Sequence, residues 1–151
     1  MSATHDLLDQ LEGSWRLRRD IAAEGATMTG VAHFTRVAAD VLHYEETGTL
    51  TLREGQTLSC SRRYRFIARG DALVILFEDE PDRGRQFVSL GFVPADAHTL
   101  VAADTHLCGP DTYTVAYRLA LPAGYETEIS VQGPRKDYTA LSRYTRLVDP
   151  V

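Results

Sequence analysis

The segment Asp104–Tyr113 carries an acid, an imidazole, a thiol and a phenol at the spacing of a β-strand. Since alternate residues of a strand share one face, Asp104, His106 and Cys108 point to the same side. On an inward face, His106 could act as a general acid or base, with Asp104 orienting it and Tyr113 donating a proton. The same-face side chains could also ligate a metal, but no second histidine stands at a metal-binding spacing. We therefore predict an interior site here and no metal.

The turn of this hairpin predicts its register. Gly109-Pro110 is a typical turn pair, so the returning strand places Tyr113 opposite His106 and Val115 opposite Asp104. If this face looks inward, one interior holds an acid, an imidazole and the phenols of the returning strand.

A second hairpin sets two opposite charges on a mostly apolar face. The apolar faces of Val41–Leu52 and Thr57–Ile67 coincide if a three-residue turn, Arg53-Glu54-Gly55, connects them. Glu46 and Arg62 then lie opposite each other on the inner side. A buried charge is costly unless it is paired, so one interpretation is a structural ion pair. The other is an interior anchor, because arginine offers a two-pronged fork to an anionic ligand group.

These side chains require a fold that is built from strands. Residues 4–11 predict a short helix, capped by Thr4, with an apolar face at Leu7, Leu8 and Leu11, and Gly13 ends it. Segments with a period of two follow, separated by turn residues. The ten predicted strands are Ser14–Asp20, Met28–Thr35, Val41–Leu52, Thr57–Ile67, Ala72–Phe77, Gln86–Val93, His98–Leu107, Thr112–Leu119, Tyr125–Val131 and Tyr138–Leu147.

The pattern predicts an all-β fold in one domain, residues 1–151. About ten strands joined by hairpins indicate an antiparallel meander, and closing it into a barrel removes exposed edges. A barrel of that strand number is wide enough to hold a ligand cavity, and the leading helix could plug one end. A two-sheet sandwich is the alternative architecture.

Composition limits the classes of function. A net charge of −5 argues against a nucleic-acid partner. No apolar run approaches the ~20 residues that cross a membrane, and the first ten residues lack the layout of a signal peptide. With only Cys60 and Cys108 available, we expect a reduced, cytoplasmic protein without a disulfide.

Gly13-Ser14-Trp15 resembles the G-x-W signature that opens lipocalins and their calycin relatives. In those families the tryptophan closes the floor of the barrel, and an arginine of the last strand packs across it. The resemblance implies that Arg143 or Arg146 takes that place here.

Five strings together resemble a bacterial family of unknown function that is itself similar to lipocalins in outline. They are Gly13-Ser14-Trp15, Tyr44-Glu45-Glu46-x-Gly48, Phe77-Glu78-Asp79, His106-Leu107-Cys108-Gly109-x-Asp111-x-Tyr113 and Gly133-Pro134-Arg135-Lys136-Asp137-Tyr138. That family has no assigned activity to transfer. Haem-binding relatives of the nitrobindin type also open with G-x-W, but they use a histidine near the C-terminal end. This chain has no histidine after His106, which disfavours haem, so we expect no cofactor.

Three functions stay open. The favoured one is a calycin-like barrel that binds a small, partly apolar ligand in its interior. The second is a small isomerase, hydratase or hydrolase in which His106 is the acid or base, oriented by Asp104 or Asp111. The third is a structural or interaction protein with a filled core, and a homodimer is also left open. The predicted ligand-binding residues are Tyr44, Glu46, Arg62, Tyr64, Asp104, His106, Tyr113 and Tyr117.

Overall fold

The computed structural model describes residues 3–147, which form one short helix, a 3₁₀ turn (η1, Ala22–Glu24) and an 11-stranded sheet. No helix in this range is long and apolar enough to cross a membrane. The helix and strands are α1 (Ala3–Leu11), β1 (Gly13–Ile21), β2 (Ala26–Ala38), β3 (Val41–Thr51), β4 (Thr57–Arg69), β5 (Ala72–Phe77), β6 (Gln86–Leu90), β7 (Val93–Pro94), β8 (Leu100–Cys108), β9 (Asp111–Ala120), β10 (Gly124–Gln132) and β11 (Asp137–Arg146).

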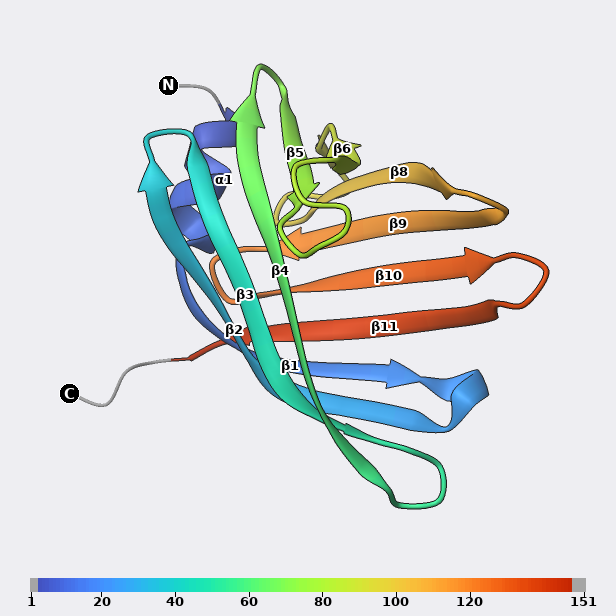
Figure 1. The fold of residues 1–151 in the computed structure, drawn as a ribbon. Coiled ribbons are helices and arrows are strands. Elements are labelled where there is room, and N and C mark those ends of the chain that lie inside the picture. The colour runs from blue at the N-terminus through green and yellow to red at the C-terminus, as the bar shows by residue number, and fades with distance from the viewer. Residues whose placement is uncertain (1–2, 148–151) are drawn as a thin grey trace.

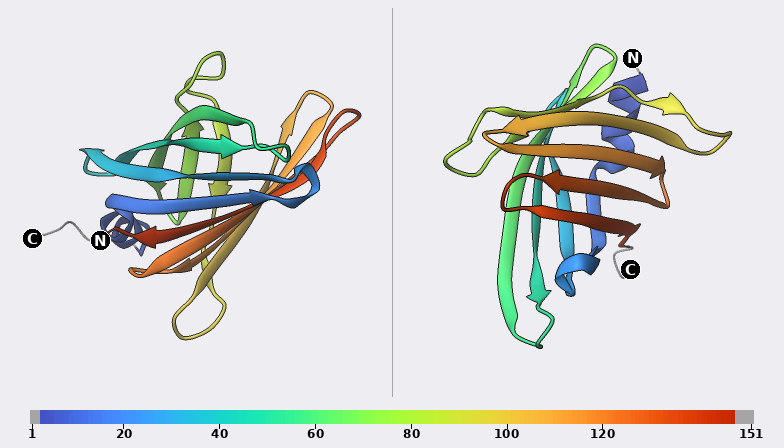
Figure 2. Two further views of the ribbon diagram at one scale, coloured as in Figure 1. Left: turned by 90° about the horizontal axis from the view of Figure 1, so that it is seen from below. Right: turned by 90° about the vertical axis from the view of Figure 1, so that its right-hand side faces the viewer.

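The strands form an antiparallel meander that curls into a half-barrel (Figure 1). Strands β1 to β6 pair in chain order, β7 to β11 do the same, and β1 pairs with β11 to join the two runs. Seen from the side, β8 to β11 run across the steeper strands of the first run, such as β3 and β4 (Figure 2). The predicted all-β meander with a short N-terminal helix is confirmed. The strand beyond the ten expected is β7, which has two residues.

Both predicted hairpin registers are confirmed. In β8 and β9, His106 pairs with Tyr113 and Asp104 with Val115. In β3 and β4, Glu46 pairs with Arg62. The connecting turn holds Gly55 in the left-handed region, where a residue without a Cβ has no steric penalty.

The helix plugs one end of the half-barrel. Its Leu7, Leu8 and Leu11 are buried against the sheet. The expected cap is wrong: the helix already begins at Ala3, and the Thr4 hydroxyl donates to the carbonyl of Gly70 instead. Thr4 therefore ties the helix to the β4–β5 turn.

Trp15 and Arg146 close the same end. The Trp15 indole N–H donates to the Leu11 carbonyl at 2.8 Å, and the Arg146 guanidinium lies 3.9 Å from the centre of the Trp15 ring. Arg146 also donates to the carbonyls of Gln10 and Glu12. Of the two expected arginines, Arg146 is the one that packs on the tryptophan.

Gly30 on β2 and Gly48 on β3 lie opposite each other in the sheet. A Cβ added at Gly30 would stand 2.1 Å from the Thr47 carbonyl oxygen, and one at Gly48 would stand 2.3 Å from that of Thr29. Only glycine permits so close an approach of two backbones. This pair also leaves a gap in the inner layer of side chains, which the site uses.

Candidate functional site

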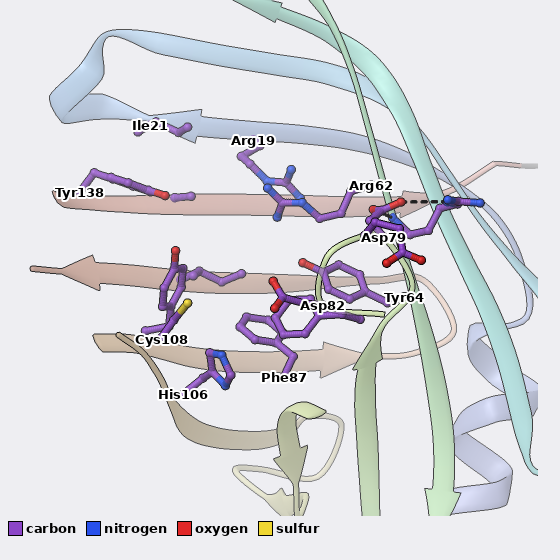
Figure 3. Close-up of a pocket in the computed structure, with 16 residues that line it drawn as sticks. Arg19, Ile21, Arg62, Tyr64, Asp79, Asp82, Phe87, His106, Cys108 and Tyr138 are labelled. Atoms are coloured by element: carbon purple, nitrogen blue, oxygen red, sulfur yellow. Dashed lines mark hydrogen bonds and ion pairs between the residues drawn. The ribbon is translucent and has the colours of Figure 1, made fainter. Parts of the chain in front are cut away.

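A cavity of about 320 Å³ lies on the concave side of the sheet (Figure 3). Its walls come from both runs of strands and from the loop between β5 and β6. The volume falls near the lower end of the range of about 300–1,000 Å³ that ligand pockets occupy. A cavity of about 20 Å³ adjoins it and shares several lining residues, and we call the larger of these two adjoining cavities the main cavity.

Aromatic rings form one wall of the main cavity. Tyr64 and Phe87 stack with their ring centres 5.8 Å apart and their planes 13° apart. The His106 ring makes edge contacts with Phe77 at 5.6 Å, with Phe87 at 5.4 Å and with Tyr113 at 6.1 Å. Such a wall suits a flat, apolar body, because aromatic surfaces prefer offset stacking and edge contacts.

A buried ion pair lies under this cavity. Arg19 donates from Nη1 to Glu46 Oε2 at 2.7 Å and from Nη2 to Glu46 Oε1 at 3.0 Å. The Arg19 Nε donates to the Ser142 hydroxyl at 2.7 Å. Tyr44 donates to Glu46 Oε1 at 2.6 Å, and its hydroxyl lies 2.9 Å from that of Tyr144. Every buried side-chain nitrogen or oxygen of the described residues has a hydrogen-bond partner, so the network is complete.

The network holds both members of the pair in their charged forms. Burial alone would raise the pKa of the Glu46 carboxyl, but the hydrogen bonds and charge of Arg19 hold that pKa below its usual value of 4.5. Burial likewise opposes the charge on Arg19, yet Tyr144 and Glu46 raise its pKa above the usual value. Burial raises the pKa of Tyr44 well above 10, so this phenol stays a donor.

Glu46 forms its ion pair with Arg19, so the expected ion pair between Glu46 and Arg62 is wrong. Sequence pairing identifies the neighbour on the adjacent strand, whereas Arg19 reaches Glu46 from β1, two strands away. Leu17, Gly30 and Gly48 form the cross-strand row between their two rows. Because Gly30 has no side chain, the long Arg19 side chain can pass over β2 at this point.

The Asp104 carboxylate binds backbone N–H groups and does not face the cavity. Its Oδ2 accepts from the backbone N–H of Ser89 on β6, and its Oδ1 from that of Thr105, each at 2.8 Å. The ladder does not pair β6 with β8, so Asp104 bridges the seam between the two ends of the curled sheet. It does not line either cavity described above.

Neither carboxylate that was expected to orient His106 contacts it. Asp104 is engaged at the seam, and Asp111 pairs with Lys136 at 3.4 Å. Within residues 3–147, no carboxylate hydrogen-bonds His106, whose contacts are with aromatic rings. In the same range, no three histidine, cysteine, aspartate or glutamate side chains could hold a metal ion.

Two of the motifs meet beside the cavity. Asp111, which follows His106-Leu107-Cys108-Gly109, lies against Gly133 of the last turn, where a Cβ would stand 1.9 Å from Asp111 Oδ1. Lys136 of that turn contacts Asp111 and the Tyr113 hydroxyl, each at 3.4 Å. The absence of a side chain at Gly133 thus lets the two turns lock together.

The predicted ligand-binding residues fall into three groups. Arg62, Tyr64, His106 and Tyr113 line the main cavity. Tyr44, Glu46 and Tyr117 line the small adjoining one. Asp104 lies at the seam.

Sequence reasoning missed most of the other lining residues, among them Arg19, Phe87 and Ile129. A signal for Arg19 was available, because alternation on β1 places it on the same face as Trp15 and Leu17. Phe87 and Ile129 carry no such signal, since an inward apolar residue can equally be part of a filled core.

Comparison with solved structures identifies the fold. An S-type phycobiliprotein lyase, CPES, from Guillardia theta superposes with a TM-score of 0.66 and 13% identity, over 99% of this chain and 95% of that one. A redesigned β-barrel, mFAP1, bound to DFHBI, superposes with a TM-score of 0.50 and 12% identity, over 92% of this chain and 97% of that one. At these identities the likeness is one of fold alone.

Comparison of sequences identifies the family. No curated protein matches the chain significantly. The model of a family of unknown function, DUF6314, matches residues 11–146, which is nearly the whole chain. The protein is therefore a member of the DUF6314 family.

Proposed function

We propose that this protein binds a small, partly apolar molecule in the 320 Å³ cavity, as calycin-like barrels do. The observation that carries the proposal is the cavity itself, which aromatic rings line without filling. Apolar walls with a few fixed polar groups are typical of small-molecule sites. The buried network under Arg19 and Glu46 supports it further, because a rigid floor lowers the entropic cost of binding.

Two other observations support this proposal. The closed end, where Trp15 stacks under Arg146 beside Gly13, is the arrangement that the calycin resemblance implies. One neighbour in fold, the redesigned barrel mFAP1, was solved bound to a small molecule, DFHBI.

The test uses the neutral fluorescent probe N-phenyl-1-naphthylamine, whose emission rises in apolar surroundings. We expect saturable binding by the wild-type protein. Ala140 lines the cavity, so Ala140→Phe fills it and should weaken binding by about tenfold or more. The matched control is Ala103→Phe, because Ala103 is exposed on the outer face of β8.

Equal affinity in the wild type and Ala140→Phe would overturn the proposal, because binding would then lie outside the cavity. Circular dichroism of the three proteins shows whether each variant keeps the fold.

A further inference from the structure

The charges around the main cavity are paired with one exception. Of the arginines that line it, Arg19 pairs with Glu46 at 2.7 Å and Arg63 with Asp79 at 2.9 Å. Within residues 3–147, Arg62 has no carboxylate at ion-pair distance, and it is solvent-exposed in the cavity wall.

The acidic residues that line the cavity do not form an ion pair with Arg62, because each is paired with another arginine. Besides Asp79, they are Glu80 and Asp82 of the β5–β6 loop. Glu80 accepts from Arg83 at 2.7 Å, and Asp82 from Arg85 at 3.3 Å. Each of the three acids that line the cavity is therefore paired with an arginine other than Arg62.

Glu46 does not neutralise Arg62 either. It lies opposite Arg62 in the sheet, but it already accepts two hydrogen bonds from Arg19 and one from Tyr44. Two guanidinium groups and one carboxylate leave this cluster with one formal positive charge. That charge faces the cavity at Arg62, whose planar guanidinium has five N–H donors, and one hydrogen bond links it to the Tyr64 hydroxyl.

We propose that the ligand is a small aromatic acid whose anionic group binds the Arg62 fork and whose ring lies against Tyr64, Phe87 and His106. This inference rests on the proposed function and names its ligand class. Tyr64 belongs to the stacked wall and stands two residues from Arg62, on the same face of β4. The anionic group and the ring of the ligand would therefore bind to neighbouring residues of the same strand. The volume of about 320 Å³ limits the ligand to one or two rings.

A pair of nearly isosteric probes tests the inference. They are 2-naphthoate, an anion, and 2-naphthamide, its neutral counterpart, titrated separately by isothermal calorimetry. We expect the wild-type protein to bind 2-naphthoate about tenfold more tightly, because a charge-assisted, two-pronged hydrogen bond is roughly twice as strong as a neutral one. A ratio near one would overturn the inference.

Variants test whether Arg62 causes the preference for 2-naphthoate over 2-naphthamide. Arg62→Gln should bring the two affinities within about threefold of each other, and Arg62→Lys should retain part of the preference, because it keeps the charge but loses the fork. The control Arg69→Gln removes the same charge from the exposed end of β4 and should keep the full preference. A preference that survives in Arg62→Gln would overturn the assignment.

The outcomes separate this inference from the proposed function. If the neutral probe binds in the cavity and 2-naphthoate binds no better than 2-naphthamide, the cavity is a binding site but its ligand is not an acid. If none of the three compounds binds, both proposals fail. Thermal unfolding followed by circular dichroism checks whether Arg62→Gln is folded, so that its affinities can be compared.

Discussion

Arg19 and Glu46 form a two-pronged ion pair although their strands, β1 and β3, are not neighbours in the sheet. The Arg19 side chain crosses β2 at Gly30, where no side chain stands in its way. Both partners are buried, at 9% and 3% exposure. The pair therefore fixes how β1, β2 and β3 curl under the cavity.

Breaking this pair on one side should destabilise the protein severely. In Glu46→Gln the Arg19 charge stays buried without its carboxylate, and we expect the free energy of unfolding to fall by about 3–5 kcal/mol. Urea unfolding can be followed by the fluorescence of Trp15, the one tryptophan of the sequence. The double variant Arg19→Met with Glu46→Leu removes both charges and should regain more than half of the loss. Equal losses in the single and double variants would contradict a coupled pair.

Stability should depend on pH through Glu46. Its pKa in the folded protein lies below the usual value of 4.5, so the unfolded chain takes up the proton first as the pH falls. The stabilisation is complete above that usual value and is lost as the pH falls through the folded pKa. Measured between about pH 6 and pH 3, the difference in unfolding free energy between the wild type and Glu46→Gln should shrink. A constant difference would show that the charge of Glu46 is not what stabilises the fold.

The seam between β6 and β8 should depend on Asp104. Asp104→Ala leaves the Ser89 amide without its acceptor, which costs about 1–3 kcal/mol locally. We expect faster hydrogen exchange at Ser89 and at its neighbours on β6. Asp104→Asn keeps one carbonyl acceptor and should lie between the wild type and Asp104→Ala. Unchanged exchange in Asp104→Ala would mean that packing alone closes the seam.

The closed end should depend on Arg146 and not on Arg143. Arg146 stacks on Trp15 and donates to two carbonyls near the end of α1, so Arg146→Ala should lower the unfolding free energy by about 1–3 kcal/mol. The emission of Trp15 should also shift to longer wavelength as water reaches the ring. Arg143→Ala is the matched control, because Arg143 is exposed on the same strand and pairs with Glu126. Its effect should stay within about 0.5 kcal/mol, and equal effects of the two changes would refute the assignment.

His106 should contribute to ligand binding through the contacts of its ring and not as an acid or base. His106→Phe keeps the edge contacts with Phe77 and Phe87, so the affinity for N-phenyl-1-naphthylamine should change by less than about threefold. His106→Ala removes the ring and should weaken binding more. A large loss in His106→Phe would show that the imidazole nitrogens contact the ligand.

The sequence by itself determined the strands and the pairing of neighbouring strands. Alternation along β3, β4, β8 and β9, together with short turns, predicted that Glu46 faces Arg62 and that His106 faces Tyr113. These relationships are local, because a short turn sets the register and the two-residue period sets the face. The place of Trp15 at the plugged end was instead what the resemblance of Gly13-Ser14-Trp15 to the calycin signature implied.

The tertiary structure alone decided which of these side chains interact. It paired Arg19 with Glu46, which left Arg62 without a carboxylate partner among residues 3–147. It also engaged Asp104 at the seam and away from His106. It also brought Phe87 of β6 beside His106 of β8, although the ladder does not pair these strands. Such contacts depend on how far the sheet curls and where its ends meet. Curling sums the twist of many strands and the gaps left by residues such as Gly30, so no single hairpin predicts it.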